Sequence, residues 1–252
     1  MLMKFCLPWK IFTNFIFLNR MGDKEYNLCK GGNAMKSAEI IKKNFVDTMY
    51  YEDKPIVKYQ IKIPKVCTRN YHSDMVINRY YEQMTGKLLY EYIPQLYHDA
   101  AARYIESQKE GYPFLMTEFD YIFTVSYNRK GFLSLYFDTY LFTGGANGAF
   151  SRIADTWDTY TGHRMELGEF FRPGFDYRSF LIDRIIEQAG EQKEDYFENA
   201  TELIEQYFDP EHYYLTDEGF AIFYEAYQIG PRTDGIPVFI IPYSAFSGEF
   251  RV

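Results

Sequence analysis

The chain has 252 residues, of which 47% are hydrophobic and 25% are charged. This composition excludes a disordered or fibrous protein and is sufficient for a sizeable core. The formal net charge of −8 argues against a nucleic-acid partner, because an acidic chain is repelled by phosphates. Three cysteines without a CxxC pair argue against a zinc ribbon and against a disulfide scaffold.

Residues 1–34 differ in character from the rest of the chain. Met1–Met21 is apolar but is interrupted by charged residues and a proline, so we predict neither a signal-peptide core nor a membrane span. The codons for Lys30-Gly31-Gly32 can be written AAAGGAGG, a bacterial ribosome-binding sequence shortly before Met35. We therefore expect residues 1–34 to be non-native upstream translation and the native chain to be cytoplasmic. The alternatives are a disordered leader or weakly hydrophobic anchor, and an extracytoplasmic protein.

The first two predicted elements are short. Ser37–Lys43 is interpreted as a helix, with Ser37 as its cap. Over Pro55–Ile63, polar and apolar residues alternate, which predicts a half-buried strand that ends at Pro64.

A long amphipathic helix is predicted next. Apolar residues recur every three or four positions from Ser73, the expected cap, to about Gln108. Pro94 lies inside this pattern and is expected to kink the helix or divide it in two.

After Gly111 the apolar period changes to two, which is typical of strands. Three strands are predicted, separated by turns: residues 121–127, Phe132–Phe142 and Phe150–Thr159. The second strand is apolar on both faces and should be central. The turns predict an antiparallel meander.

The last third of the chain contains two predicted helices and three short predicted strands. The helices are Phe180–Gln192 and Glu194–Tyr207, and the strands are Tyr213–Leu215, Phe220–Tyr224 and Val238–Ile241. Because strands and helices cluster separately, we predict an α+β fold with an antiparallel sheet meander packed against the long helix, rather than βαβ winding. We divide the chain into α+β regions at 35–130 and 131–252.

The segment Thr143-Gly-Gly-Ala-Asn-Gly148 is rich in glycine but lacks the lysine and the following helix of a phosphate loop. We interpret it as a structural turn that needs positive φ at Gly144, Gly145 or Gly148.

No motif indicates catalysis, a cofactor or a metal. The four histidines, at positions 72, 98, 163 and 212, have no ligand spacing. There is no GxSxG motif, and Cys67 has no histidine nearby in the sequence. Acidic residues are frequent in and after the meander: Asp138, Asp155, Asp158, Glu166 and Glu169. A glycosidase would need two of these in one cleft.

Two separated sets of residues resemble the bacterial DUF3298 (RsiV-like) family. The first set is Leu133-Ser-Leu-Tyr-Phe137, Tyr140, the glycine segment, Trp157, Thr161-Gly162, Leu167 and Phe170-Phe171. The second set is Asp217-Glu-Gly219, Phe223-Tyr224, Tyr227, Ile229-Gly-Pro231, Gly235-Ile-Pro237 and Ile241-Pro-Tyr243. Residues 57–127 are similar to the DUF4163 region of PdaC-type deacetylases.

The resemblance implies an α+β fold whose C-terminal half is similar to a subdomain of the Hsp70 ATPase. It implies no catalytic residues, and it implies a recognition role, since RsiV-like domains bind lysozyme. We take as candidate ligand-binding residues Tyr140, Asn147, Trp157, Tyr227 and Arg232. Two of them depart from the family pattern, because relatives commonly have His at position 147 and an aromatic residue near position 232.

We therefore expect a non-catalytic domain that binds an unknown protein or glycan. The surplus of tyrosine, 25 residues, suits such a surface, since aromatic rings give contact area at low entropic cost. The alternative is an enzyme acting on cell-wall glycan, or its accessory domain, that uses carboxylates and tyrosines at the sheet edge.

Overall fold

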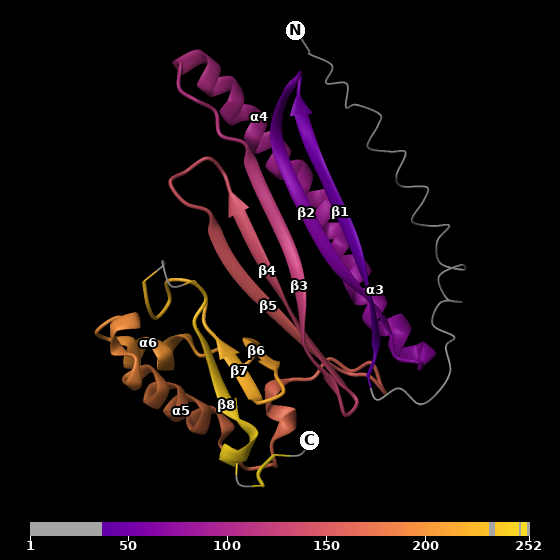
Figure 1. Cartoon of the computed structure of the whole chain (residues 1–252), viewed down its shortest axis with the longest axis vertical. Helices are drawn as coiled ribbons and strands as arrows, with labels where there is room; N and C mark the ends of the chain where they lie inside the picture. The colour runs from indigo at the N-terminus through magenta and orange to yellow at the C-terminus, as the bar shows by residue number, and fades with distance from the viewer. Residues whose placement is uncertain (1–36, 232–234, 247, 251–252) are drawn as a thin grey trace. The chain divides into compact units, whose positions relative to one another are not determined.

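The computed structural model describes residues 37–231, 235–246 and 248–250, and divides the chain into the units Met1–Met35 and Lys36–Val252. The second unit contains two sheets (Figure 1). A five-stranded sheet has the order β1-β2-β3-β4-β5, and a three-stranded sheet has the order β6-β7-β8. The strands of the larger sheet are β1 (Glu39–Tyr51), β2 (Lys54–Cys67), β3 (Thr117–Arg129), β4 (Phe132–Phe142) and β5 (Ala149–Asp158).

The first predicted element is wrong: Ser37–Lys43 forms no helix, and strand β1 begins at Glu39. β1 pairs with β2 along its whole length in an antiparallel hairpin. Asn128 holds Ala38 beside the sheet through two hydrogen bonds of 2.8 Å. The Asn128 side-chain oxygen accepts from the Ala38 backbone N–H, and its side-chain NH₂ donates to the Ala38 carbonyl. Pairing with β2 therefore overrides the weak local preference for a helix.

Strand β2 continues through Pro64 to Cys67, so the prediction that Pro64 ends it is also wrong. β2 pairs with β3 only over Val57–Lys62. Beyond that point β1 is its only neighbour among the described strands, and a proline without an N–H is tolerated where one side of a strand is unpaired.

The long helix is present but is built in three parts. Asn70, and not Ser73, is the N-cap of α3 (Tyr71–Lys87), because its side chain accepts hydrogen bonds from two backbone N–H groups. A π-helical segment, Leu88–Tyr92, connects α3 to α4 (Ile93–Glu110).

The π-helical segment explains how Pro94 is accommodated. Pro94 follows the first residue of α4, where the missing N–H costs little. The wider turn also adds one residue to the helical repeat. As a result Ile93 is buried, with 3% of its surface exposed, while Tyr92, the residue that the repeat predicts, is 36% exposed.

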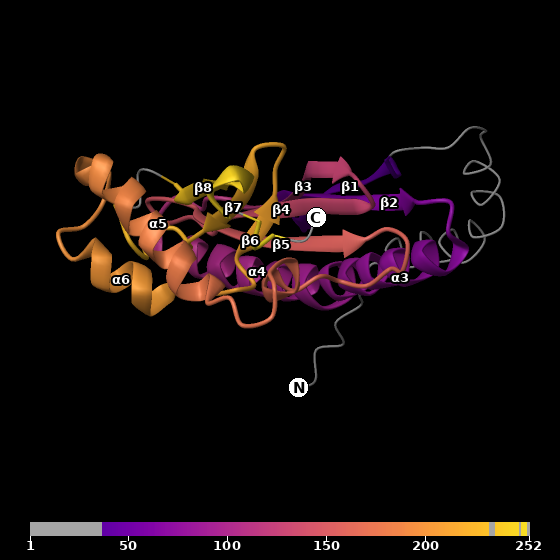
Figure 2. The same ribbon diagram turned by 90° about the horizontal axis from the view of Figure 1, so that it is seen from below.

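One feature of the sheet differs from the predicted meander. β3, β4 and β5 form antiparallel neighbours as expected, but β2 and β3 are parallel. The α3–α4 helix returns the chain to the same end of the sheet, which is a crossover connection. The helix covers one face of the sheet (Figure 2), and its buried residues Ile77, Tyr81 and Leu96 pack with strand residues such as Leu135 and Phe137.

The C-terminal part contains the smaller sheet and two further helices. Its elements are α5 (Tyr177–Glu191), α6 (Ala200–Tyr207), β6 (Tyr213–Leu215), β7 (Gly219–Phe223) and β8 (Val238–Pro242). The second predicted helix is shorter than expected, since residues 193–195 form a separate 3-10 turn. A core rich in phenylalanine, including Phe170, Phe220 and Phe246, holds this part together.

The smaller sheet packs against the other face of β4 and β5. Tyr214, Ala221 and Phe223 bury Ala154 of β5, and the Ser134 hydroxyl of β4 accepts a 2.9 Å hydrogen bond from the Leu215 backbone. The division predicted at 130/131 falls within the β3–β4 hairpin, so it cuts through one continuous sheet.

Candidate functional site

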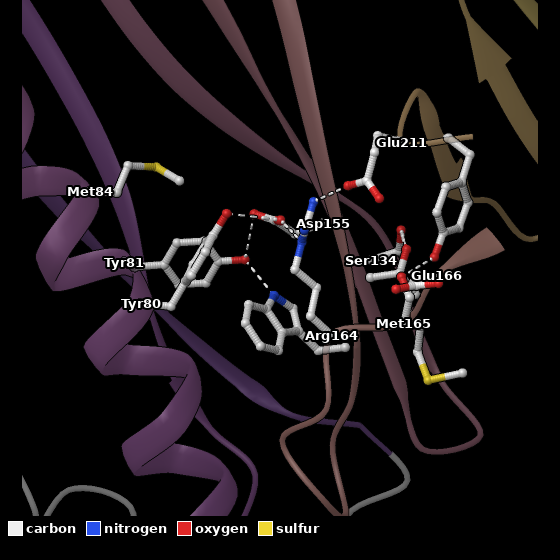
Figure 3. Close-up of polar contacts among 12 residues, drawn as sticks. Tyr80, Tyr81, Met84, Ser134, Asp155, Arg164, Met165, Glu166 and Glu211 are labelled. Atoms are coloured by element: carbon white, nitrogen blue, oxygen red, sulfur yellow. Dashed lines mark hydrogen bonds and ion pairs between the residues drawn. The ribbon is translucent and has the colours of Figure 1, made fainter. Parts of the chain in front are cut away.

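A buried carboxylate, Asp155 of β5, lies at the centre of a polar cluster beside α3 (Figure 3). Arg164 Nε donates to Asp155 Oδ1 at 2.7 Å, and the hydroxyls of Tyr80 and Tyr81 donate to its two oxygens at 3.3 and 3.4 Å. The Trp157 indole donates to the Tyr81 hydroxyl at 2.7 Å. The cluster therefore joins α3, β5 and the segment that follows β5.

The electrostatics of this cluster are those of a structural ion pair. Burial raises the pKa of Asp155, although Arg164 and the two tyrosines oppose it. Burial and the nearby carboxylate raise the pKa of Tyr80 to about 12 and the pKa of Tyr81 well above its usual value. Arg164 also pairs with Glu211 at 2.7 Å. The ion pair and the two neutral hydroxyls satisfy one another.

The other carboxylates that the sequence offered as catalytic candidates are also held by local contacts. Asp138 forms an ion pair with Arg152, with oxygen–nitrogen distances of 2.7 and 2.9 Å. Asp158 accepts hydrogen bonds of 2.7 and 3.2 Å from two backbone N–H groups in the next turn. Glu166 and Glu169 form the capping box of a short 3-10 helix. Each of these side chains thus has a structural role.

Metal binding has no support in the part of the chain that the structure describes. Within it, no group of three His, Cys, Asp or Glu side chains could hold a metal ion. His163 lies beside Glu169 at 2.9 Å, and His212 stacks on Phe223 with ring centroids 4.7 Å apart.

Arg152 of β5 lies on the opposite face of the sheet from Asp155. Its guanidinium is paired with Asp138, lies 4.0 Å from the ring centroid of Tyr136 and donates to the Tyr214 hydroxyl at 3.3 Å. Burial alone would lower the pKa of Arg152, but Asp138 raises it. The side chain of Arg152 is 12% exposed and that of Asp138 is 42% exposed, so the pair is fixed on one side and reaches solvent on the other.

Next to this pair, a row of side chains crosses all five strands on the face that the helix does not cover. Strand register places Val46, Gln60, Asp120, Tyr140 and Phe150 side by side. The Tyr140 and Phe150 ring centroids are 4.9 Å apart, and Phe150 is 52% exposed. We name these five residues, with Asp138 and Arg152 of the neighbouring row, the open face.

The structure separates the five ligand-binding residues that the sequence suggested. Tyr140 belongs to the open face, and Asn147 is exposed in the loop between β4 and β5. Trp157 is buried, with 3% of its surface exposed, so it belongs to the core and not to a surface site. Tyr227 is 63% exposed and packs edge-on against Phe197. Arg232 lies outside the described residues.

Two of the three glycines in the glycine segment occupy positions that favour glycine, and one of these, Gly148, lies against Tyr140 of the open face. Gly144 has φ of +88°, which favours glycine. At Gly148, a side chain would come within 2.1 Å of the Tyr140 ring. Gly145 has neither a positive φ nor a neighbour within 4 Å, so the positive φ predicted for this turn occurs at Gly144 and not at Gly145.

Sequence reasoning missed five residues of the open face: Val46, Gln60, Asp120, Phe150 and Arg152. Strand alternation indicates which side of its own strand Gln60, Asp120, Phe150 or Arg152 occupies, but Val46 lies on β1, which the sequence did not predict. Their alignment in rows depends on the parallel pairing of β2 with β3, which local sequence does not encode.

A shallow hollow of about 420 Å³ lies elsewhere, lined by residues including Glu169, Phe171, Arg172 and Tyr177. Phe171 stacks on Tyr177 with ring planes 6° apart, but Phe171 is only 3% exposed. This hollow contains no residue of the open face and does not include Asp155.

The fold and the open face define an α+β protein with two successive parts. Residues 51–149 match the family model Deacetylase PdaC, and residues 168–244 match the family model Protein of unknown function (DUF3298). The two family models thus match the chain in the order that the sequence predicts, which confirms the resemblance to PdaC-type and DUF3298 proteins.

Two crystal structures share this fold. A DUF3298 family member from Bacteroides fragilis is 17% identical with a TM-score of 0.66, over 86% of this chain and 95% of that chain. A DUF3298 family protein from Pseudomonas aeruginosa is 18% identical with a TM-score of 0.54, over 88% and 97%. The search of curated proteins gives no match. The similarity to an Hsp70 ATPase subdomain stays a prediction.

No helix within the described ranges is both long and apolar enough to cross a membrane.

Proposed function

We propose that this chain is a non-catalytic ligand-binding domain and that its ligand lies on the open face. The observation that carries the proposal is the use of the acidic side chains. The five carboxylates that the sequence offered as catalytic candidates are engaged in ion pairs, caps or turns, whereas Phe150, Tyr140 and Asp120 face outward on a sheet.

The rigidity of the open face supports a binding role. Its residues are on strands, and Arg152 is held by Asp138 and by aromatic rings. A surface fixed before binding loses less conformational entropy when the ligand arrives. The family resemblance supports either a protein or a glycan as the ligand, and the proposed function includes both.

The experiment is a pull-down from an extract of the native host that contains cell-envelope fractions. It measures which components of the extract bind to the immobilised chain. The wild-type chain and Phe150→Ala serve as baits, with Tyr207→Ala as the matched control, because Tyr207 is an exposed aromatic residue on α6. We expect a component retained by the wild type and by Tyr207→Ala but not by Phe150→Ala.

The retained component is then incubated with the chain and its mass is measured. A binding domain returns it unchanged. Conversion to a product would contradict the proposal and support the glycan-acting enzyme, and equal retention by all three baits would place the binding site elsewhere.

A further inference from the structure

The chemistry of the open face narrows the ligand class. Its aromatic part is the Tyr140–Phe150 pair, with ring planes at 41° and Phe150 half exposed on a strand at the edge of the sheet. Aromatic faces carry partial negative charge and pack against polarised C–H groups, such as those on the faces of sugar rings. The pair therefore offers a platform at one end of the row.

The polar part of the open face consists of planar side chains: the carboxylates of Asp120 and Asp138 accept hydrogen bonds, and the Gln60 amide both donates and accepts them. Asp120 lies next to Tyr140 across the strands, and Gln60 lies next to Asp120. Asp138 keeps its carboxylate 42% exposed while Arg152 fixes its orientation. A ligand rich in hydroxyl groups would satisfy such a surface, because a hydroxyl both donates and accepts.

Charge separates this face from the rest of the chain. By the alternation of their strands, Lys42, Lys58, Lys62 and Arg152 lie on the same side of the sheet as Glu118, Asp120 and Asp138. Four positive and three negative groups leave this face close to neutral, although the chain has a net charge of −8. Neither a polyanion nor a strongly basic protein is favoured by such a balance.

The distribution of apolar groups also disfavours a protein partner. The two half-exposed apolar side chains of the row, Val46 and Phe150, lie at opposite ends, with Gln60 and Asp120 between them. Protein interfaces are centred on a contiguous, desolvated group of anchors. Strand spacing of about 4.8 Å is comparable to the length of one pyranose unit, so successive sugars could lie over successive strands.

We infer that the open face binds an uncharged glycan chain that runs across the strands. Its sugar rings stack on Phe150 and Tyr140, and its hydroxyls bond to Asp120, Gln60 and Asp138. This inference rests on the proposed function and names its ligand class. A glycan ligand also favours the extracytoplasmic location over the cytoplasmic one.

The test uses an array of uncharged oligosaccharides of four to six glucose, galactose, mannose or N-acetylglucosamine units. Wild-type chain, Phe150→Ala, Asp120→Asn and the control Tyr207→Ala are applied at about 0.15 M and at about 0.5 M salt, where charge attraction between exposed groups is screened. Circular dichroism and thermal melting establish that each variant is folded.

We expect saturable binding to at least one oligosaccharide series, with equal affinity at both salt concentrations. Phe150→Ala should weaken it at least tenfold, Asp120→Asn by a smaller factor, and Tyr207→Ala should have no effect. Binding of no uncharged oligosaccharide by the folded wild type, or affinity unchanged in Phe150→Ala, would overturn the inference.

Failure of this inference differs from failure of the proposed function. If the component that Phe150→Ala fails to retain from the host extract is a protein, the open face is still the binding site and only the ligand class is wrong.

Discussion

The two faces of the five-stranded sheet carry similar residue types in different environments, one buried beneath the helix and one partly exposed to solvent. On the helix-covered face, Asp155 pairs with Arg164 and Phe137 is fully buried among apolar neighbours. On the open face, Asp138 pairs with Arg152 and Phe150 is half exposed. The same residue types stabilise the fold on the first face and remain available to a ligand on the second. The environment of a side chain, and not its type, therefore decides which role it has.

The largest expected difference concerns the two phenylalanines. Phe137→Ala should lower the free energy of unfolding by about 3–5 kcal/mol, because it leaves a cavity among residues that cannot collapse into it. Phe150→Ala should lower it by about 1 kcal/mol or less, since its ring already contacts water. Urea unfolding of both variants measures the difference. Comparable losses would mean that Phe150 is part of the core.

The two carboxylates should differ in the same direction. Asp155→Ala leaves Arg164, Tyr80 and Tyr81 without their shared acceptor, and we expect a loss of about 2–3 kcal/mol. Asp138→Ala should cost about 1 kcal/mol or less, because Asp138 is partly solvated and Arg152 keeps its aromatic contacts. Chemical denaturation at one fixed pH gives both values, and a larger loss for Asp138→Ala would reverse our assignment of the two faces.

The pH dependence of the free energy of unfolding should be smaller than the effects of these substitutions, and it reports directly on the burial of Asp155. Because burial raises the pKa of Asp155, the folded chain holds a proton there in a range above about pH 4 where the unfolded chain has released it. Stability contributed by Asp155 is thus fully present below its unfolded pKa and declines as pH rises through its folded pKa, by at most about 1.4 kcal/mol per unit.

Comparison with Asp155→Asn isolates this term, because asparagine does not titrate. The stability of the wild type minus that of the variant should decrease from about pH 4 to about pH 7. An increase over this range would show that the attraction of Arg164 outweighs the cost of burial.

The sequence predicted the elements whose patterns are local. Strands β3, β4 and β5 alternate clearly, and the predicted central position of β4 is confirmed by its two neighbours. The long helix was also recognised from its apolar repeat. These features depend on residues within a few positions of one another, which is what a periodic pattern records.

The errors arise where distant residues decide the structure. Glu39–Tyr51 is a strand because β2 folds back on it, and β2 passes Pro64 because β3 does not extend that far. Trp157 matched a family motif but is buried under α3, where its indole bonds to Tyr81. The open face depends on a register across five strands, so no single segment could reveal it.

The π-helical segment Leu88–Tyr92 has a consequence for how sequences of this kind are aligned. The backbone N–H of Ile93 donates to the carbonyl of Leu88, five residues earlier. An α-helix makes this bond over four residues, so the π-helical turn contains one extra residue. A relative with an uninterrupted α-helix would match α3 and α4 only with a one-residue gap between them. An alignment without that gap would match Tyr92, instead of the buried Ile93, to the core residue of the relative. All later core positions of α4 would then be shifted by one residue.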